Sequence, residues 1–261
     1  TLDPLASGLL VICLGAATRL SEYLISKDKR YRARVRFGRS TTTCDAEGQV
    51  TAESASLPSR AAVEQALVNF RGSIQQRPPA FSAVQRGGQR AYALARRGEV
   101  VELPLRSVEI IALELAAWQP PECELDVLCS AGTYIRSLAH DLGQALGCGA
   151  YLAALRRTAS GRFLVTEAAS LEQVGAEFNT GEWQRRLLPA AAAVADLPEV
   201  VLDQEAARRI LNGQAVPLEG AQRADQLARA YNPAGELVAL LRADAAAQVW
   251  RPYKVLAGRV G

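Results

Sequence analysis

The sequence predicts an α+β protein, and three observations carry this prediction. Residues 30–37 alternate strictly between apolar and charged side chains, which is typical of a strand with one buried face. Strand patterns at 107–116 and 123–129 precede a helical pattern at 133–146, so strands and helices do not alternate regularly as they do in doubly wound folds. The composition, 49% hydrophobic and 22% charged over 261 residues, excludes disordered, collagen-like and coiled-coil chains.

The strand at 30–37 is the clearest element. Its even-numbered positions form what we call the arginine ladder: Arg30, Arg32, Arg34 and Arg36. Its odd-numbered positions are Tyr31, Ala33, Val35 and Phe37. Because successive side chains of a strand point to opposite faces, the apolar set is expected in the core and the ladder on the surface.

Helices are expected at four further places before residue 150. The segments are 18–26, 59–70, 89–97 and 133–146. Ser59 is a suitable N-cap for the second, and Gly147 ends the last. A polar loop is expected between them at 41–48.

A small C-terminal module is expected beyond residue 197. An alanine-rich stretch ends there, and strand patterns follow at 199–202, 236–241 and 248–256, with a helix at 204–211. We therefore divide the chain into domains 1–197 and 198–261.

The charges are segregated, although the net charge is only +3. Residues 19–39 hold eight basic and two acidic side chains, and residues 60–106 hold eight and three. Nearly all are arginines, whose planar fork suits phosphate oxygens, so a polyanionic partner is one interpretation and an arginine-favouring genome the other.

Several site classes are disfavoured by the sequence. The five cysteines contain no C-x-x-C pair and are expected to be free thiols in a reducing cytoplasm, without a metal site. No apolar run is long enough to span a membrane. Phosphate-binding glycine motifs are absent, which disfavours nucleotide cofactors. The one histidine, His140, is expected in a packed position rather than in catalysis.

Asp3 is the acid with the most unusual setting, because its neighbours are small or apolar. A carboxylate before proline most often forms a turn. Arg136, at the start of an apolar helix, is a candidate cation for it, although a surface arginine is the plainer interpretation. Tyr31 suits either the core or base stacking.

Four segments together resemble the TruB family of tRNA pseudouridine synthases. In order, they are Thr1-Leu2-Asp3-Pro4-Leu5-Ala6-Ser7-Gly8-Leu9-Leu10, Asp28-Lys29-Arg30-Tyr31, Gly132-Thr133-Tyr134-Ile135-Arg136 and Leu155-Arg156-Arg157-Thr158. Phe70-Arg71-Gly72 and Asp45-Ala46-Glu47-Gly48 also agree. The family's Gly-His pair and an early strand would precede Thr1, so we expect the sequence to lack its N-terminus.

The resemblance implies a fold and a reaction. The fold would be a mixed, mostly antiparallel sheet flanked by helices, followed by a small PUA-like RNA-binding barrel at 198–261. The reaction would isomerise the T-loop uridine at tRNA position 55, after that base is flipped out of its stack. No cofactor or metal would be needed. The partner would be the tRNA T-arm, held partly by an RNA-clamping thumb at about 77–106, and the protein would be a cytoplasmic monomer without an obligatory protein partner or membrane.

The resemblance also implies site residues. Asp3 would be the nucleophile, at the sugar or at the base ring. Arg136 would pair with and orient it, and Tyr31 would stack on the uracil. Substrate-binding positions would be Leu155, as an apolar floor, with Lys29, Arg30 and Arg156.

Other interpretations remain at this point. A non-catalytic RNA-binding or tRNA-folding protein could keep the same fold, and a guide-RNA-dependent relative of the dyskerin type would need partner proteins. A hydrolase acting on sugars or phosphates would need a second carboxylate near Asp3.

Overall fold

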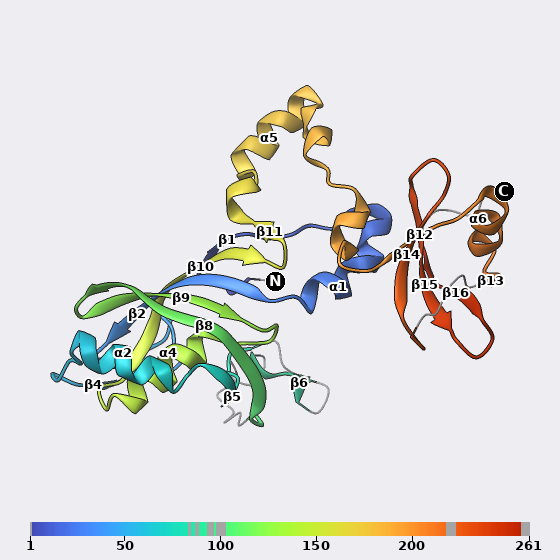
Figure 1. The fold of residues 1–261 in the computed structure, drawn as a ribbon. Helices are drawn as coiled ribbons and strands as arrows, with labels where there is room; N and C mark the ends of the chain where they lie inside the picture. Colours follow the sequence, from blue (N-terminus) through green and yellow to red (C-terminus); the bar gives the residue numbers. More distant parts are fainter. Residues whose placement is uncertain are drawn as a thin grey trace. The chain divides into compact units, whose positions relative to one another are not determined.

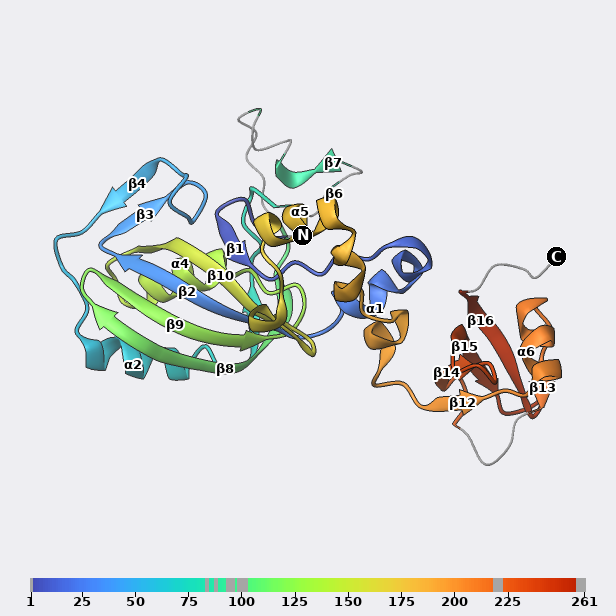
Figure 2. The ribbon, with the colours of Figure 1, turned by 90° about the horizontal axis from the view of Figure 1, so that it is seen from above.

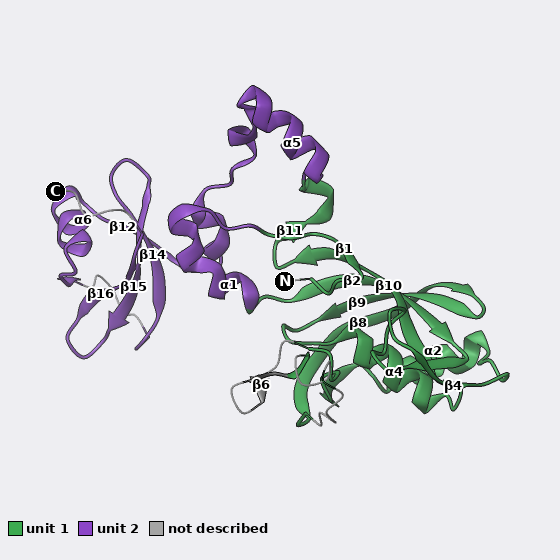
Figure 3. Cartoon of the chain, turned by 180° about the vertical axis from the view of Figure 1, so that it is seen from behind, with its two compact units in different colours: residues 1–11, 26–168 green, residues 12–25, 169–261 purple. Residues whose placement is uncertain are grey.

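The computed structural model describes residues 2–82, 85–86, 89–92, 97, 103–217 and 223–256. The chain forms two compact units, shown in different colours in Figure 3. The first unit comprises Thr1–Val11 and Ser26–Ala168, and the second comprises Ile12–Ile25 and Ala169–Gly261. Each unit is described on its own.

The first unit is built on a seven-stranded sheet in the order β1-β10-β2-β9-β8-β5, with β11 paired to β10 (Figure 1). The strands are β1 (Ala6–Gly8), β2 (Lys29–Phe37), β5 (Gly72–Gln76), β8 (Arg106–Gln119), β9 (Glu122–Cys129), β10 (Ala150–Ser160) and β11 (Phe163–Leu164). Only the β1–β10 pair of this sheet is parallel, and the other pairs are antiparallel. The predicted mixed, mostly antiparallel sheet is confirmed.

Helices α2 (Arg60–Val68) and α4 (Ile135–Ala145) cover one face of this sheet (Figure 2). Their buried side chains form one hydrophobic core with the inward residues of β2, as Leu67, Leu138 and Val35 illustrate. The arginine ladder lies on the more exposed side of β2, and the apolar residues lie on the more buried side, so the predicted alternation of this strand is confirmed. One face of the sheet and one face of each helix are thus buried against each other, as in other α+β proteins.

Both predicted helices of this core are confirmed, within two residues at their ends. The Ser59 side chain accepts the Ala62 N–H at 3.2 Å and so caps α2. In α4, Gly143 allows close packing on the sheet, because a Cβ there would lie 2.1 Å from the Ala150 nitrogen of β10. Gly147 follows the helix at φ +69°, as expected of a residue that ends one.

Two sequence-based expectations need correction. The predicted helix at 89–97 is absent at its start, since β7 (Gln89–Arg90) pairs with β6 (Gln85–Arg86) and helical backbone is described only at 91–92. Residues 93–96 lie outside the described part, as does much of the predicted thumb at 77–106. The helix at 18–26 is a 3-10 turn, η1 (Gly15–Leu20), followed by α1 (Ser21–Ile25). The loop predicted at 41–48 is confirmed, and it connects β3 (Arg39–Thr41) to β4 (Val50–Glu53), which pair as a hairpin.

The second unit contains a five-stranded sheet in the order β12-β14-β15-β16-β13. Its strands are β12 (Glu199–Val201), β13 (Val216–Pro217), β14 (Leu227–Tyr231), β15 (Leu237–Asp244) and β16 (Val249–Val255). Helix α6 (Gln204–Leu211) packs its buried Ile210 into a core with Leu241 and Trp250. The predicted C-terminal strands and helix are confirmed, and β13 and β14 were not predicted. The boundary between 197 and 198 stays a prediction.

Along the sequence, short helices follow the last strand of the first sheet and precede the first strand of the second. They are η2 (Val165–Glu167) in the first unit, and α5 (Leu171–Thr180), η3 (Glu182–Arg186) and η4 (Ala190–Val194) in the second. Among the described residues, the structure contains no helix of the length and hydropathy needed to cross a membrane.

Candidate active site

Asp3 lies in the turn that leads into β1. The Ala6 N–H donates to the Asp3 carbonyl oxygen at 2.9 Å, so the turn is closed by backbone and leaves the carboxylate free for other contacts. Gly8 allows β1 to lie close to β10, because at its φ of +95° a Cβ would lie 2.3 Å from the Arg157 carbonyl oxygen. Only glycine fits there. The short strand thereby holds Asp3 at a defined place against β10.

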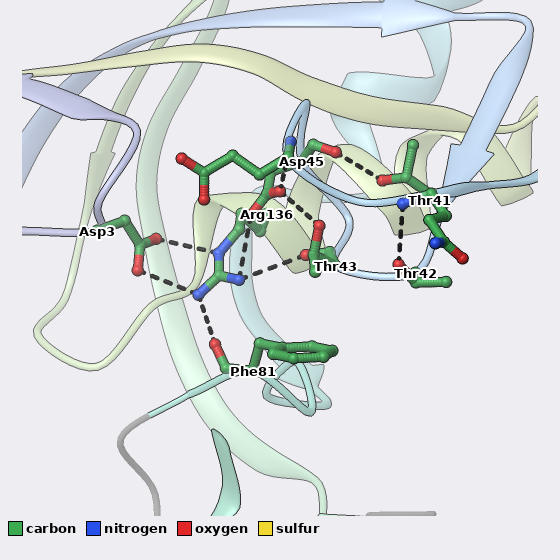
Figure 4. A network of polar contacts seen from close by, with 9 residues as sticks. Asp3, Thr41, Thr42, Thr43, Asp45, Phe81 and Arg136 are labelled. Atoms are coloured by element: carbon green, nitrogen blue, oxygen red, sulfur yellow. Dashed lines mark hydrogen bonds and ion pairs between the residues drawn. The ribbon is translucent and has the colours of Figure 1, made fainter. Parts of the chain in front are cut away.

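Arg136 is the centre of the site, and its guanidinium uses all five of its N–H donors (Figure 4). Nε and Nη2 donate to the two carboxylate oxygens of Asp3 at 3.1 and 3.0 Å. Nη1 donates to Asp45 Oδ2 at 3.2 Å and to the Thr43 carbonyl at 3.3 Å. Nη2 also reaches the Phe81 carbonyl at 2.9 Å. Because the fork is saturated, its orientation is fixed.

The two ends of this ion pair differ in their access to solvent. The side chain of Arg136 is 5% exposed, whereas that of Asp3 is 29% exposed. The arginine is therefore enclosed while the carboxylate keeps an open side. A carboxylate held in this way can act as a nucleophile or as a general base toward a molecule that enters from solvent.

Asp45 is a second buried carboxylate in the network, and the sequence indicated it only as part of a matching segment, without a role. Its side chain accepts the Thr43 hydroxyl and the Glu47 N–H, the latter at 3.1 Å, besides Arg136. Its exposed fraction is only 3%, so it is locked in place by hydrogen bonds and faces no solvent. The sequence signal was slight: a short, polar run of threonines before an acid that forms an Asx turn. This second carboxylate lacks the open side that hydrolase chemistry would require.

Tyr31 lies on β2 opposite Arg157 of β10. Burial raises the pKa of the Tyr31 hydroxyl, the charge of Cys129 raises this pKa further, and Arg157 opposes the shift. Asp3 is close enough to contribute to the same rise. The hydroxyl is therefore neutral at physiological pH, and the side chain packs against the hydrophobic core.

Leu155 lies between the strands that carry the other candidates. Its register partners are Ala6 of β1 and Ala33 of β2, and its side chain is buried. The structure thus brings Asp3, Arg136, Tyr31 and Leu155 into one region of the first unit.

The three basic candidates lie at the margins of this region. Arg30 and Arg156 are exposed. Lys29 is half-buried, and its ammonium donates to the Lys27 carbonyl. Burial lowers the pKa of Lys29, and the nearby Arg157 lowers it further.

Arg157 is a buried residue of the fourth matching segment, and the sequence indicated no role for it. Its Nε donates to the Leu9 carbonyl at 2.8 Å, and the Leu9 N–H donates to the Arg157 carbonyl at 2.8 Å. It thereby ties the chain just after β1 to β10.

The rest of the arginine ladder is not a free basic surface. Arg32 lies 3.4 Å from Glu124 and 3.3 Å from Asp126, both on β9. Arg34 and Arg36 lie 3.5 and 3.4 Å from Glu122. Acidic side chains of β9 therefore neutralise much of the ladder, because β9 pairs directly with β2.

All five cysteines are free, as expected. Cys44 adjoins Asp45, and burial raises its pKa to about 11, so the thiol is protonated at neutral pH. Among the described residues, no three His, Cys, Asp or Glu side chains are grouped so as to hold a metal ion.

Comparison with known proteins places these observations in context. Residues 1–135 match the model of the TruB family pseudouridylate synthase N-terminal domain, and residues 136–207 match that of the tRNA pseudouridylate synthase B C-terminal domain. The chain is 46% identical over 245 residues to the tRNA pseudouridine synthase B of Thiobacillus denitrificans, covering 94% of this chain and 81% of that protein. It is 48% identical over 219 residues to that of Symbiobacterium thermophilum, covering 82% and 71%.

A solved structure is similar over nearly the whole chain. It is the crystal structure of a Cbf5–Nop10–Gar1 complex, with a TM-score of 0.74 and 27% sequence identity, covering 99% of this chain and 75% of the matched one. The mixed catalytic sheet and the small C-terminal β unit are thus those of the pseudouridine synthase fold with a PUA-like domain.

Proposed function

Since the chain belongs to the TruB family of pseudouridylate synthases, we propose that it isomerises the T-loop uridine of tRNA to pseudouridine with Asp3 as the reacting carboxylate. The observation that supports this role is the bidentate pair between Asp3 and the saturated, enclosed guanidinium of Arg136. A single acid with an open side, fixed from behind by a cation, is suited to attack a substrate group brought in from solution.

The reaction rearranges bonds within one nucleotide. Asp3 adds to the sugar or to the uracil ring, the N1–C1′ glycosidic bond breaks and the base turns. A C5–C1′ bond then forms, and the bond between the nucleotide and Asp3 breaks, which releases the carboxylate. The hydrogen on C5 is lost to a base and the ring nitrogen is left protonated, so atoms and electrons balance without a redox partner. Arg136 holds the carboxylate oxygens in one orientation throughout.

Two apolar or aromatic residues complete the proposed pocket. Tyr31 stacks on the uracil and, as a neutral phenol, is able to donate a hydrogen bond. Leu155 forms an apolar floor between the strands of Asp3 and Tyr31. A base inside a stem-loop stack cannot reach these groups, so the uridine is flipped out at a cost of about a few kcal/mol.

The RNA contacts are proposed at the edge of this pocket. Lys29, Arg30 and Arg156 bind phosphates next to the flipped nucleotide, and the segment at 77–106 clamps the T-arm. Residues 1–197 act as the catalytic domain and residues 198–261 as the RNA-binding domain. The protein works in the cytoplasm as a monomer without an obligatory partner.

The test is to incubate the protein alone with an unmodified T-arm hairpin and to detect pseudouridine by chemical labelling. We expect pseudouridine at the T-loop uridine, and we expect Asp3→Asn to lower the rate by on the order of 10⁴-fold or more, because the nucleophile is lost. RNA affinity should stay within about threefold.

The outcomes separate the alternatives. Product formed by Asp3→Asn at the wild-type rate rules out Asp3 as nucleophile. RNA binding without product from the wild type favours a non-catalytic RNA-binding or tRNA-folding protein. Product only in the presence of added guide RNA and partner proteins favours the dyskerin type.

A further inference from the structure

The start of α4 is held by an unusual contact, which determines where Arg136 lies. Tyr134 precedes the helix in an extended conformation, and no side chain from its own segment caps the first turn. Arg136 is the second residue of the helix. A small shift of this turn therefore moves the guanidinium by a similar amount.

Gln76, the last residue of β5, supplies the missing anchor. Its carboxamide oxygen accepts the Tyr134 N–H at 2.8 Å, and its Nε2 donates to the Tyr134 carbonyl at 3.0 Å. One side chain thus occupies both backbone groups of a single residue, as a neighbouring strand would. The side chain of Gln76 is 1% exposed, so this contact is protected from competing water.

The residue after Gln76 adds a third hydrogen bond to the same turn. The hydroxyl of Ser137 donates to the Arg77 carbonyl at 2.7 Å. The end of β5 is itself fixed, because Gln76 pairs with Arg106 of β8 in the sheet. Hydrogen bonds to Gln76 and Arg77 thus fix the start of α4 relative to the sheet on both sides of Arg136.

We infer that Gln76 is a positioning residue for pseudouridine formation: its carboxamide sets the first turn of α4 so that the Arg136 fork meets both oxygens of Asp3. This inference rests on the proposed function. Gln76 touches neither carboxylate nor substrate, and acts through Tyr134. The five N–H contacts of Arg136 tolerate little displacement, and misplacing a reacting group by about 1 Å can cost on the order of 100-fold in rate.

The test compares Gln76→Leu, which keeps the approximate size and removes both hydrogen bonds, with a matched control. Leu67→Ala is suited to this, because Leu67 is buried in the same core but on α2. For each variant we would measure the single-turnover rate with saturating T-arm hairpin, the hairpin dissociation constant and the thermal midpoint. A second reporter is the NMR signal of the Arg136 Nε–H, assigned from its loss in Arg136→Lys.

We expect Gln76→Leu to lower the single-turnover rate by about tenfold or more, as loss of a residue that orients a functional group does. The dissociation constant should stay within about twofold, and the Arg136 Nε–H signal should broaden or shift. Leu67→Ala should lower the thermal midpoint but keep the rate within about twofold and the signal unchanged. This division separates positioning from general loss of stability.

Gln76→Glu covers the case in which the leucine variant does not fold. It keeps the acceptor for the Tyr134 N–H and loses the donor to the Tyr134 carbonyl, so a reduced rate with unchanged RNA affinity is expected. The inference is overturned if the variant that folds keeps both the wild-type rate and the wild-type Arg136 signal, or if Leu67→Ala loses as much of both. If the wild type itself forms no pseudouridine, the proposed function fails, and the Arg136 signal then decides only whether Gln76 sets the position of Arg136.

Discussion

Two sets of arginine–carboxylate pairs in the first unit have the same chemistry and very different surroundings. In the network of Asp3, Arg136 and Asp45, the arginine side chain is 5% exposed and every N–H has a partner. In the ladder, Arg32 is 45% exposed and lies 3.3 to 3.4 Å from its acids. Charge counting in the sequence does not distinguish the two sets.

The difference is one of solvation. An exposed pair contributes about 0–1 kcal/mol, because water screens the charges and the side chains lose entropy. A buried pair gains little net stability either, but breaking it by removing one partner costs about 3–5 kcal/mol, since a charge is left without compensation. Stability does not explain why the chain keeps the buried network. What the network provides instead is a fixed orientation of the Asp3 carboxylate.

The largest effect that this comparison predicts is that of Arg136→Gln. The change leaves two carboxylates facing one another around a neutral amide, so we expect a loss of about 3–5 kcal/mol in the free energy of unfolding. Arg32→Gln, the exposed counterpart, should cost less than about 1 kcal/mol. Urea unfolding followed by circular dichroism measures both.

Equal losses in these two variants would contradict the comparison. If Arg136→Gln is too unstable to purify, Arg136→Lys provides the measurement, because it keeps the charge and loses the planar fork. We expect it to fold and to form pseudouridine at least about tenfold more slowly, on the same grounds of lost orientation.

A smaller effect is expected for the carboxylate that faces no solvent. Asp45→Asn keeps the shape but places an amide where Arg136 requires an acceptor, so we expect a loss of about 1–3 kcal/mol. The single-turnover rate should fall by about tenfold, because the rear of the guanidinium is no longer fixed. Glu122→Gln, which removes an acid from two ladder pairs, is the matched control and should change neither quantity appreciably. A wild-type rate in Asp45→Asn would show that the other contacts of Arg136 orient it without Asp45.

A still smaller effect is expected for RNA affinity when the ladder is altered. Replacing Arg32, Arg34 and Arg36 together by glutamine should change the dissociation constant for the T-arm by less than about threefold, or about 0.6 kcal/mol. The acids of β9 already offset these charges. The slope of log affinity against log salt should change by less than about one. A loss of several units in this slope would instead make the ladder a phosphate-binding surface.

The smallest effect concerns Asp141 of α4, a half-buried carboxyl without a guanidinium partner in the part of the chain described. Burial raises its pKa, and His140 only partly opposes this. An acid whose pKa is higher in the folded than in the unfolded state costs stability once it ionises, and this cost disappears as the pH falls through the folded pKa. Asp141→Asn should therefore raise the thermal midpoint slightly at pH 7 to 8, and the gain should vanish near pH 3. A gain that persists at low pH would point to a cause other than charge.

The sequence predicted the elements whose patterns are local and regular. The alternation of β2, the amphipathic stripes of α2 and α4 and the C-terminal strands depend on neighbouring residues, and they are confirmed. Strand β10 was not predicted, although it lies between β1 and β2. Two irregularities in its register with β2, between Leu152 and Ala154 and between Arg157 and Ala159, interrupt the period-two pattern that would indicate a strand.

The residues of the site differ in the same way: those in recognisable local motifs could be predicted, and those that depend on distant contacts could not. The contact between Asp3 and Arg136 was expected from the resemblance of two motifs, and the structure contains it. No role was assigned to Asp45 or Gln76 from the sequence, because their importance comes from contacts with residues 91 and 58 positions away along the chain. The pairing of the ladder with β9 was missed for a similar reason, since only the register of two strands reveals it.

The one parallel pair of the large sheet has a consequence for how the molecule is assembled. β1 has no hairpin partner, and joins a strand about 150 residues further along the chain, where Ala6 lies opposite Leu155. Closing so long a loop is entropically unfavourable and slow. Any chain that stops before β10 therefore has no partner for the strand that follows Asp3, so the ion pair of Asp3 and Arg136 depends on a strand that is synthesised after both residues.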